Sequence, residues 1–561
     1  MSVTLSHTAR LEADLQRRAQ VAPPPGAASV RFSILTTVYE RTDAALFAET
    51  AACLRGQTLP LHEWVVLAHG PVPAALDRLL DEYAGDPSFR LMRLPTNLGI
   101  MGGMRVCLEA ASGDYIVPMD ADDLLTVDAL QVMAGEIAQR GAPALLYSDE
   151  DILIDGVPRS PYQRPDWDPV LNLASSYVWH LCVIHRETAL RLALYTDAGA
   201  SWCHDWDTMF RVSEAGLEPV HVPEVLYHWR QHPASSTNRP DPESGSRRSQ
   251  RHLLERRLAR EPHPGHWRIV DFPVFRGAPE WHVERLPIEP PPVDLIVVGA
   301  IDRAAAVPAA SRRLTAPASV AAPPRPWYQR WFGLGAAVVP TEVAATNIGA
   351  LRRALEASSA PRVLVVSEAV EFAGADGWWE AVRLFELFPE VAAVSGYLLD
   401  RSGRVVGGAP LVFPNGRVVV PQAGRPADDP GPFAIALKPH CVAGVPTDLF
   451  MAERTLLRTV VDALPDEAPL AGLGLRLGLA ALAAGRRVAF SPLIRATVLG
   501  TRLDDGPAGA LQAALDQALD GGGRDALCGR VLSAAGFLDD AAVGPGARCE
   551  RPTSRSGRDG T

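Results

Sequence analysis

The chain has 561 residues, more than a single small module requires and enough for two large α/β domains or up to four smaller ones. Its 54 basic and 65 acidic residues give a formal net charge of −11, and Lys438 is the only lysine. The lack of a basic excess argues against a nucleic-acid partner. With 47% hydrophobic residues, the bulk of the chain is expected to form globular cores and not to be disordered.

Cysteine placement and apolar segments bear on the cellular setting. The seven cysteines are scattered without a Cys-x-x-Cys pair, so neither a disulfide framework nor a thiolate zinc site is indicated, and a reducing, cytoplasmic setting fits. Residues 1–20 are polar and lack the apolar core of a signal peptide. The most apolar late stretch, residues 470–484, contains Arg476 and is too short to span a bilayer. At most peripheral membrane contact is therefore expected.

The first half of the chain alternates between predicted strands and helices. Residues 1–29 form a polar leader that ends in a Pro-Pro-Pro-Gly run and is typical of a linker, so order is expected to begin near Val30. Apolar runs and helical stretches then alternate at residues 32–38, 44–54, 64–67, 74–83, 89–94, 101–111 and 115–119. This alternation predicts parallel β-α-β units and an α/β fold.

A second domain of similar build is predicted after two proline-rich segments, residues 287–292 and 317–326, with residues 293–298 as a fresh buried strand. The later course of the chain is a diverged internal repeat of the earlier one. The matching segments are residues 97–99 with 347–349 and residues 205–223 with 474–492. The expected organisation is a polar leader or linker at residues 1–29, a first domain at 30–270, a second domain at 290–505, and a C-terminal helix at 508–519 within a tail, residues 506–561, that ends in disorder.

The strongest single feature is the run Asp120-Ala121-Asp122-Asp123, which follows the predicted strand directly. A buried parallel strand that ends in carboxylates places them at the carboxyl edge of the sheet, where α/β proteins bind ligands. Carboxylate oxygens suit Mg²⁺ or Mn²⁺, and such a metal neutralises a diphosphate. The structural alternative is a turn in which Asp123 caps a helix at residues 124–137. For Asp123 both interpretations stay open, whereas one cap does not explain three acids, which favours the metal for Asp120 and Asp122.

Seven short motifs follow one another along the chain. They lie at residues 33–41, 97–100, 120–123, 147–151, 165–167, 204–207 and 227–232. In order and spacing they resemble family 2 glycosyltransferases of the GT-A fold, in the tandem-domain form associated with O-antigen and other surface polysaccharides. The resemblance covers residues 30–237 well and residues 293–501 weakly. It implies a Rossmann-like, nucleotide-diphospho-sugar transferase (GT-A) domain followed by a second, degenerate GT-A-like domain.

The resemblance implies an inverting transfer of a sugar from a nucleotide diphosphate to a glycan hydroxyl. In this family the first and third positions of the Asp-x-Asp motif contact the sugar nucleotide and the metal, which correspond to Asp120 and Asp122. The catalytic base is an aspartate that opens a helix, which corresponds to Asp205. The reaction requires such a base because the acceptor hydroxyl loses its proton as it attacks the anomeric carbon. A helix cap is the structural alternative for Asp205.

The same resemblance implies the remaining site residues. His232 is the expected partner of Asp122 at a Mn²⁺ or Mg²⁺ ion, and Arg230 offers forked donors to phosphate. The expected donor-binding residues are Thr37, Tyr39, Glu40, Asn97, Arg105, Asp120 and Arg230. The candidates for acceptor binding are Asp207 and His180, although a surface acid explains Asp207 and core packing explains His180 equally well.

Two departures from the family pattern stand out. Ala68-His69-Gly70-Pro71 replaces the usual Asp-Asp-Gly-Ser turn, so the acid that grips the base is missing, which weakens the expected preference for a UDP- or dTDP-sugar. In the second domain none of the catalytic residues has a chemical equivalent. The positions that correspond to Asp120, Asp122, Asp205, Asp207 and His232 hold Ser367, Ala369, Gly474, Arg476 and Thr501. We therefore expect a second domain without catalysis that serves acceptor binding, assembly or stability.

The expected function is a metal-dependent glycosyltransferase of bacterial surface polysaccharide synthesis, O-antigen or capsule. It is expected in the cytoplasm, acting on a glycan or lipid-linked glycan at the inner face of the cytoplasmic membrane. The alternative is a non-catalytic, glycan-binding scaffold that keeps both folds. A nucleotidyltransferase is a third candidate, but it predicts a glycine-rich loop that Thr37-Val38-Tyr39-Glu40-Arg41 does not provide.

Overall fold

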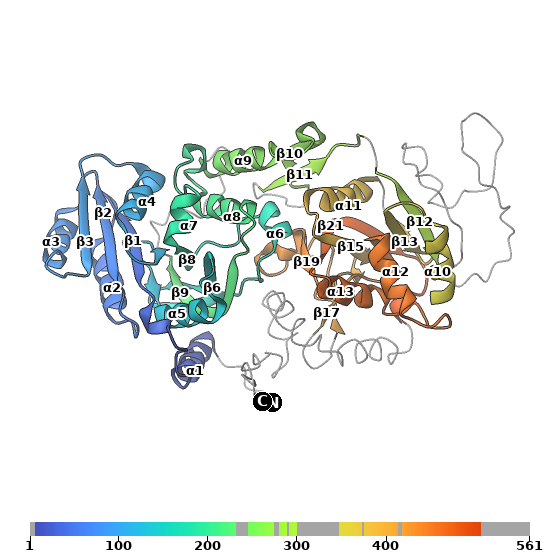
Figure 1. Cartoon of the computed structure of the whole chain (residues 1–561), viewed down its shortest axis with the longest axis horizontal. Helices are drawn as coiled ribbons and strands as arrows, with labels where there is room; N and C mark the ends of the chain where they lie inside the picture. Colours follow the sequence, from blue (N-terminus) through green and yellow to red (C-terminus); the bar gives the residue numbers. More distant parts are fainter. Residues whose placement is uncertain are drawn as a thin grey trace, which may run out of the picture. The chain divides into compact units, whose positions relative to one another are not determined.

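The computed structural model describes residues 6–231, 245–273, 280–288, 291–299, 347–372, 375–412 and 418–505. The chain divides into two compact units, the first comprising residues 1–264 and 269–283, the second residues 265–268 and 284–561 (Figure 1). The predicted helix at 508–519 and His232 lie outside the described residues. Within those ranges, no helix combines the length and apolar character needed to cross a bilayer.

The first unit is built on one mixed sheet. Its strands are β1 (Phe32–Val38), β2 (Glu63–His69), β3 (Phe89–Leu94), β4 (Tyr115–Pro118), β5 (Leu124–Leu125), β6 (Leu145–Ile154), β7 (Val157–Tyr162), β8 (Cys182–His185) and β9 (Val220–Arg230). They lie in the order β3-β2-β1-β4-β8-β6-β9-β5, and β7 pairs with β6. The pairs β1–β2, β2–β3 and β1–β4 are parallel, so the carboxyl ends of these four strands meet at one edge.

Helices cover both faces of this sheet. They are α2 (Ala44–Arg55), α3 (Ala74–Tyr83), α4 (Gly99–Ala110), α5 (Ala129–Arg140), α6 (Pro169–Ala174), α7 (Arg186–Arg191), α8 (His204–Glu214) and α9 (Gly245–Leu258). Alternate β1 residues, including Ile34 and Val38, share one buried cluster with α2, α3 and α5. Thr37, which points the other way, contacts α4 at Gly103.

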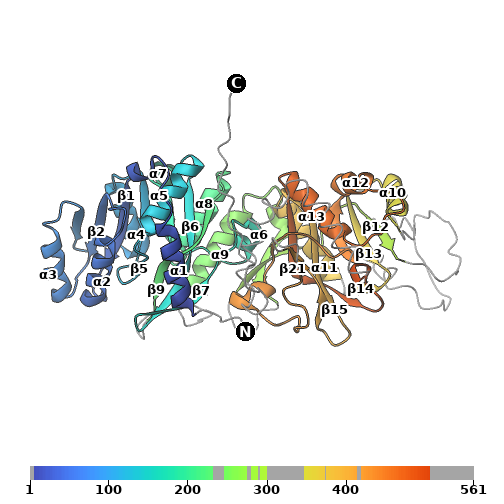
Figure 2. The same ribbon diagram turned by 90° about the horizontal axis from the view of Figure 1, so that it is seen from below.

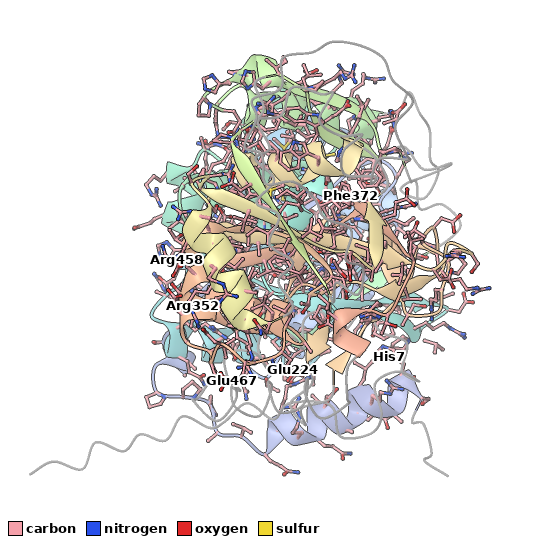
Figure 3. The ribbon with its side chains drawn as sticks, turned by 90° about the vertical axis from the view of Figure 1, so that its right-hand side faces the viewer. His7, Glu224, Arg352, Phe372, Arg458 and Glu467 are labelled. Atoms are coloured by element: carbon pink, nitrogen blue, oxygen red, sulfur yellow. The ribbon has the colours of Figure 1, made fainter. Side chains whose placement is uncertain are left out.

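The N-terminal segment differs from the expected leader, because residues 7–19 form a helix, α1 (His7–Ala19), that lies against β7 (Figure 2). None of its residues is buried, so polar contacts hold it in place. His7 Nε2 lies 2.7 Å from Asp151 Oδ2, and Arg18 donates to Asp128 at 2.6 Å and to Glu224 at 2.9 Å. Figure 3 labels His7, which belongs to this helix, and Glu224, which belongs to β9 and pairs with Arg18.

Arg18→Ala is expected to lower the free energy of unfolding by about 1–3 kcal/mol, because two acids lose a hydrogen-bonding partner. The Arg18 side chain is 9% exposed, as against 55% for Arg17, which also pairs with Glu224. The matched variant Arg17→Ala should cost less than about 1 kcal/mol. Urea unfolding of both variants measures the difference. Equal, small shifts would contradict the docking of α1.

The second unit has a sheet of its own. Its strands are β12 (Val293–Val298), β13 (Arg362–Ser367), β14 (Val370–Phe372), β15 (Val391–Leu399), β20 (Leu449–Glu453) and β21 (Arg487–Val498), with β16 (Val405–Gly407) on β15 and β19 (His440–Val442) on β21. A separate two-stranded sheet pairs β17 (Leu411–Val412) with β18 (Val418–Val419). The helices are α10 (Ile348–Ala357), α11 (Ala375–Leu387), α12 (Arg454–Asp462) and α13 (Leu473–Ala483).

Strand order and direction match between the two main sheets. The order β12-β13-β20-β15-β21-β14 reproduces β1-β4-β8-β6-β9-β5. The successive pairs are parallel, antiparallel, antiparallel, parallel and antiparallel in both units. The internal repeat in the sequence thus has a structural counterpart over six strands.

Candidate active site

The acidic run lies at the carboxyl end of β4, in a loop that the neighbouring strand and helix hold. Met119 N–H donates to Leu35 O at 3.0 Å, and Thr36 Oγ1 donates to Met119 O at 3.0 Å. Thr50 Oγ1, on α2, donates to Asp123 O at 2.9 Å. Asp120 is exposed and Asp123 is buried.

Asp123 is not a helix cap, which corrects that alternative from the sequence. The short strand β5 follows it, and α5 begins only at Ala129. Its carboxylate accepts from Tyr227 OH at 2.5 Å and from Arg230 N–H at 2.7 Å. Burial, reinforced by the charge of Asp120, raises the pKa of Asp123 well above its ordinary value. A cation beside it would offset this cost.

His180 completes a cluster of potential metal ligands. One ligand atom each from Asp120, Asp123 and His180 lies within 4.8 Å of the others. Its ring stacks on that of Tyr227, with centroids 4.7 Å apart and planes at 6°. The sequence prediction of Asp122 and His232 as ligands differs: Asp122 is not a member of this cluster, and His232 lies outside the described residues.

A buried ion pair between Arg164 and Glu150 holds the His180 ring. Its Nδ1 lies 2.9 Å from Glu150 Oε2, and Arg164 NH2 lies 2.8 Å from the same carboxylate oxygen. Arg164 is fully buried and also donates to the carbonyl oxygens of Ser148 and Tyr177, each at 2.8 Å. Burial opposes the charge on Glu150, but Arg164 and His180 outweigh it and lower its pKa. Burial likewise opposes the charge on His180, yet Glu150 and the two aspartates raise its pKa to about 9.

Asp205 lies in the first turn of α8, where a carboxylate interacts favourably with the helix dipole. Its Oδ2 accepts from Ser176 Oγ at 3.2 Å, and Trp179 Nε1–H donates to the same hydroxyl at 3.1 Å. Ser176, which bonds to Asp205, and His180 thus belong to one short segment, residues 176–180. The segment ties the predicted base to the acidic cluster.

Asp207 is bound within the protein, which argues against the predicted contact with an acceptor. It is 1% exposed and pairs with Arg211 at 2.8 Å and with Arg256 of α9. Both carboxylate oxygens accept from an arginine. In this arrangement Asp207 holds α8 against α9.

Most of the predicted donor-binding residues gather where β1 ends and α4 begins. Thr37 lies against Gly103 of α4. Because a Cβ on Gly103 would lie 2.8 Å from Thr37 Cγ2, this position excludes a larger residue. Tyr39 and Glu40 follow β1, half-buried and exposed respectively. Asn97 Oδ1 accepts from Gly99 N–H at 2.8 Å, at the start of α4.

Arg105 and Arg230 are engaged elsewhere than expected for diphosphate ligands. Arg105 donates to Glu109 on its own helix at 2.6 Å. Arg230 donates to Asp122 O at 2.6 Å and to Glu49 at 2.7 Å, while its backbone donates to Asp123. Arg230 therefore holds the acidic loop in place, a role that the sequence did not reveal.

His69 stands at the end of β2, in the turn that departs from the family pattern. It is 2% exposed, and Leu98 N–H donates to its Nδ1 at 3.2 Å. Burial lowers its pKa, which favours the neutral ring. A neutral imidazole thus lies in the turn where the family pattern has two acids.

In the second unit, the position that aligns with Asp205 has no room for a side chain, and the position that aligns with Asp120 holds a serine. Ser367 ends β13 and accepts from Ala369 N–H at 3.1 Å. A Cβ on Gly474 would lie 2.0 Å from Val445 O, so no side chain fits where the first unit has Asp205. Within the described part of the second unit, no group of three potential metal ligands occurs.

A mixed α/β sheet with acids at the carboxyl end of a parallel strand is the arrangement expected of the GT-A fold. Residues 33–202 match the family described as Glycosyl transferase family 2. The part of the first unit from residue 33 to residue 202 is therefore similar to a family 2 glycosyltransferase domain.

Two relatives are named for polysaccharide synthesis. The O-antigen biosynthesis protein RfbC of Myxococcus xanthus is 30% identical over 258 residues, 44% of this chain and 20% of that protein. The amylovoran biosynthesis glycosyltransferase AmsE of Erwinia amylovora is 22% identical over 205 residues, 35% of this chain and 74% of that protein. The similarity to RfbC thus spans a fifth of its length.

Solved structures with detectable similarity include S. aureus TarS 1-349 in complex with UDP-GlcNAc. It is 15% identical, with a TM-score of 0.35, over 41% of this chain and 67% of that one. GalNAc-T7 with UDP, GalNAc and Mn2+ is 14% identical, with a TM-score of 0.34, over 45% and 57% of the two chains.

Proposed function

We propose that this chain is a metal-dependent, inverting glycosyltransferase that moves a sugar from a nucleotide diphosphate onto a glycan hydroxyl in polysaccharide synthesis. The observation that carries the proposal is the connection of Asp205 to the Asp120, Asp123 and His180 cluster through residues 176–180. The proposed base and the proposed metal ligands are thereby linked through one short segment, which fits a reaction that requires positioned groups. The names of RfbC and AmsE support polysaccharide synthesis as the setting.

Asp205 is the proposed base. It accepts the proton of the acceptor hydroxyl while that oxygen forms a bond to the anomeric carbon, and the bond from that carbon to the diphosphate oxygen breaks. The nucleoside diphosphate leaves with the electron pair. Because the attack is a single displacement opposite the leaving group, the anomeric configuration inverts. Ser176 orients the carboxylate through its 3.2 Å hydrogen bond.

Asp120, Asp123 and His180 would hold Mn²⁺ or Mg²⁺. Two carboxylates and one imidazole are ligands that Mn²⁺ accepts. A divalent ion held there neutralises charge on the departing diphosphate. Glu150 orients the His180 ring, as carboxylates commonly do for ligating histidines.

The expected partners are a UDP- or dTDP-sugar donor and a glycan or lipid-linked glycan, with peripheral contact at the inner face of the cytoplasmic membrane. Thr37, Tyr39 and Asn97 are proposed to contact the donor, and His69 to lie near its base. The second unit is proposed as a degenerate GT-A-like domain without catalysis, which its six-strand match and the closed position at Gly474 support.

The experiment that tests this function is a donor screen with the full chain. Release of nucleoside diphosphate is measured for UDP-, dTDP- and GDP-sugars with Mn²⁺ and with excess chelator. We expect turnover of at least one donor and its loss with chelator. A chain that releases nothing from any donor would be the glycan-binding scaffold instead.

A further inference from the structure

Trp202 is an exposed aromatic residue a few positions before Asp205, the proposed base. Its exposed fraction is 69%, the highest of any large apolar side chain in the described ranges. It precedes α8 and lies three positions before Asp205 along the chain, a span of at most about 11 Å between Cα atoms. Aromatic residues, tryptophan among them, are enriched at binding surfaces relative to the rest of the protein surface.

The first turn of α9 supports the indole on one side. A Cβ on Gly245 would lie 2.3 Å from Trp202 Nε1, so the absence of a side chain there makes room for the ring. Trp202 N–H donates to Ser249 Oγ at 3.3 Å, and Cys203 Sγ lies 3.6 Å from Ser246 O. Since one side of the indole rests on α9, the exposed area belongs to the rest of the ring.

The same helix keeps Trp202 at a fixed position relative to Asp205. Three side-chain contacts link the two segments: Cys203 with Ser246, Asp207 with Arg256, and Glu214 with Arg260. Residues 203–214 are thereby held to residues 246–260. A ligand on Trp202 would be held at a set distance from the base.

The surroundings of the indole indicate a sugar as the occupant. Among the described residues, those that flank the indole include Ser201, His204, Ser246 and Ser249, whose polar groups suit the rim of a sugar better than a lipid chain. A pyranose presents one face of C–H groups, which suits an aromatic plate, and a rim of hydroxyls, which suits hydroxyl and imidazole neighbours. Tryptophan supplies such contact area at little cost in conformational entropy.

We propose that Trp202 is the platform for the acceptor glycan and binds a pyranose ring next to the unit whose hydroxyl faces Asp205. This inference rests on the proposed function, because it takes Asp205 to mark the acceptor hydroxyl. Trp202 contacts no reacting atom and acts on acceptor specificity alone.

The test uses the full chain and a panel of methyl glycosides of glucose, galactose, N-acetylglucosamine, mannose and rhamnose, observed by saturation-transfer-difference NMR. We expect transfer to the ring protons of at least one glycoside, an affinity about fivefold or more weaker in Trp202→Ala, and retention in Trp202→Phe. The control Val157→Ala, at another exposed apolar side chain of the first unit, should behave as wild type. Because Trp202 is exposed, thermal unfolding of all variants should be nearly unchanged.

Release of nucleoside diphosphate from the donor without added acceptor separates the two proposals. Trp202→Ala should retain wild-type release, because the donor site does not include the indole. Unchanged glycoside binding in Trp202→Ala, or a wild type that binds no glycoside, would overturn the platform. A wild type without release would overturn the proposed function, and with it the acceptor role, whatever the glycosides do.

Discussion

Asp205→Asn should lower the rate of sugar transfer by about 10²–10⁴-fold, the range that general-base catalysis contributes. The amide keeps the shape of the side chain and its hydrogen bond with Ser176 but cannot take a proton at neutral pH. Donor affinity should be unchanged, because the proposed donor residues gather at the end of β1 and the start of α4 and do not include Asp205. Single-turnover kinetics measures the rate, and calorimetry measures the donor affinity.

Two controls sharpen this prediction. Ser176→Ala removes one hydrogen bond to Asp205, of 3.2 Å, and should slow transfer by at most about tenfold. Thermal unfolding of Asp205→Asn should stay close to wild type, because a charge in the first turn of a helix contributes about 0.3–1 kcal/mol. Wild-type turnover in a folded Asp205→Asn variant would remove the base assignment.

Asp123→Asn and Asp120→Asn should each weaken Mn²⁺ binding by more than about 100-fold. Loss of a residue that only supports a metal ligand costs about 10–100-fold, and loss of a ligand itself should cost more. Each removes one anionic ligand from the cluster with His180. Electron paramagnetic resonance of free Mn²⁺ during titration measures the affinity directly. Transfer should fall in parallel, since the diphosphate then leaves without charge compensation.

Asp122→Asn is the matched control for this prediction. If Asp122 and His232 hold the ion, as the motif predicts, Asp122→Asn loses Mn²⁺ and Asp123→Asn does not. Because Asp123 is 1% exposed and bonded to Tyr227, its variant could unfold, whereas Asp120 is exposed and its variant should fold normally. Wild-type Mn²⁺ affinity in Asp120→Asn would contradict the proposed cluster.

The elements around the site could be predicted from local patterns. Apolar runs locate β1 to β4 to within a few residues, and a strand that leads into three acids places Asp120 at the carboxyl edge. The gapless match between residues 205–223 and 474–492 anticipates the repeat of strand order. These inferences succeed because each depends on a short segment and its periodicity.

The contacts that hold the site depend on residues far apart in the chain. Arg230 meets Asp123 across 107 positions, and His180 meets Glu150 across 30. A single sequence carries no signal for such pairs, so neither the contact of Arg230 with Asp123 nor the position of Arg164 can be predicted from it. Helix α1 is not predicted because its apolar stripe is short, Leu11 and Leu15 within a polar segment, and because contacts to Asp128, Asp151 and Glu224 hold it.

The claim that the first unit transfers sugar with inversion is tested most directly by time-resolved proton NMR of donor hydrolysis. The full chain is mixed with Mn²⁺ and α-linked UDP- or dTDP-sugars, and the anomeric protons are followed before mutarotation. We predict release of nucleoside diphosphate with the β-anomer of the sugar appearing first. First appearance of the α-anomer, or no release from any donor, would contradict the account.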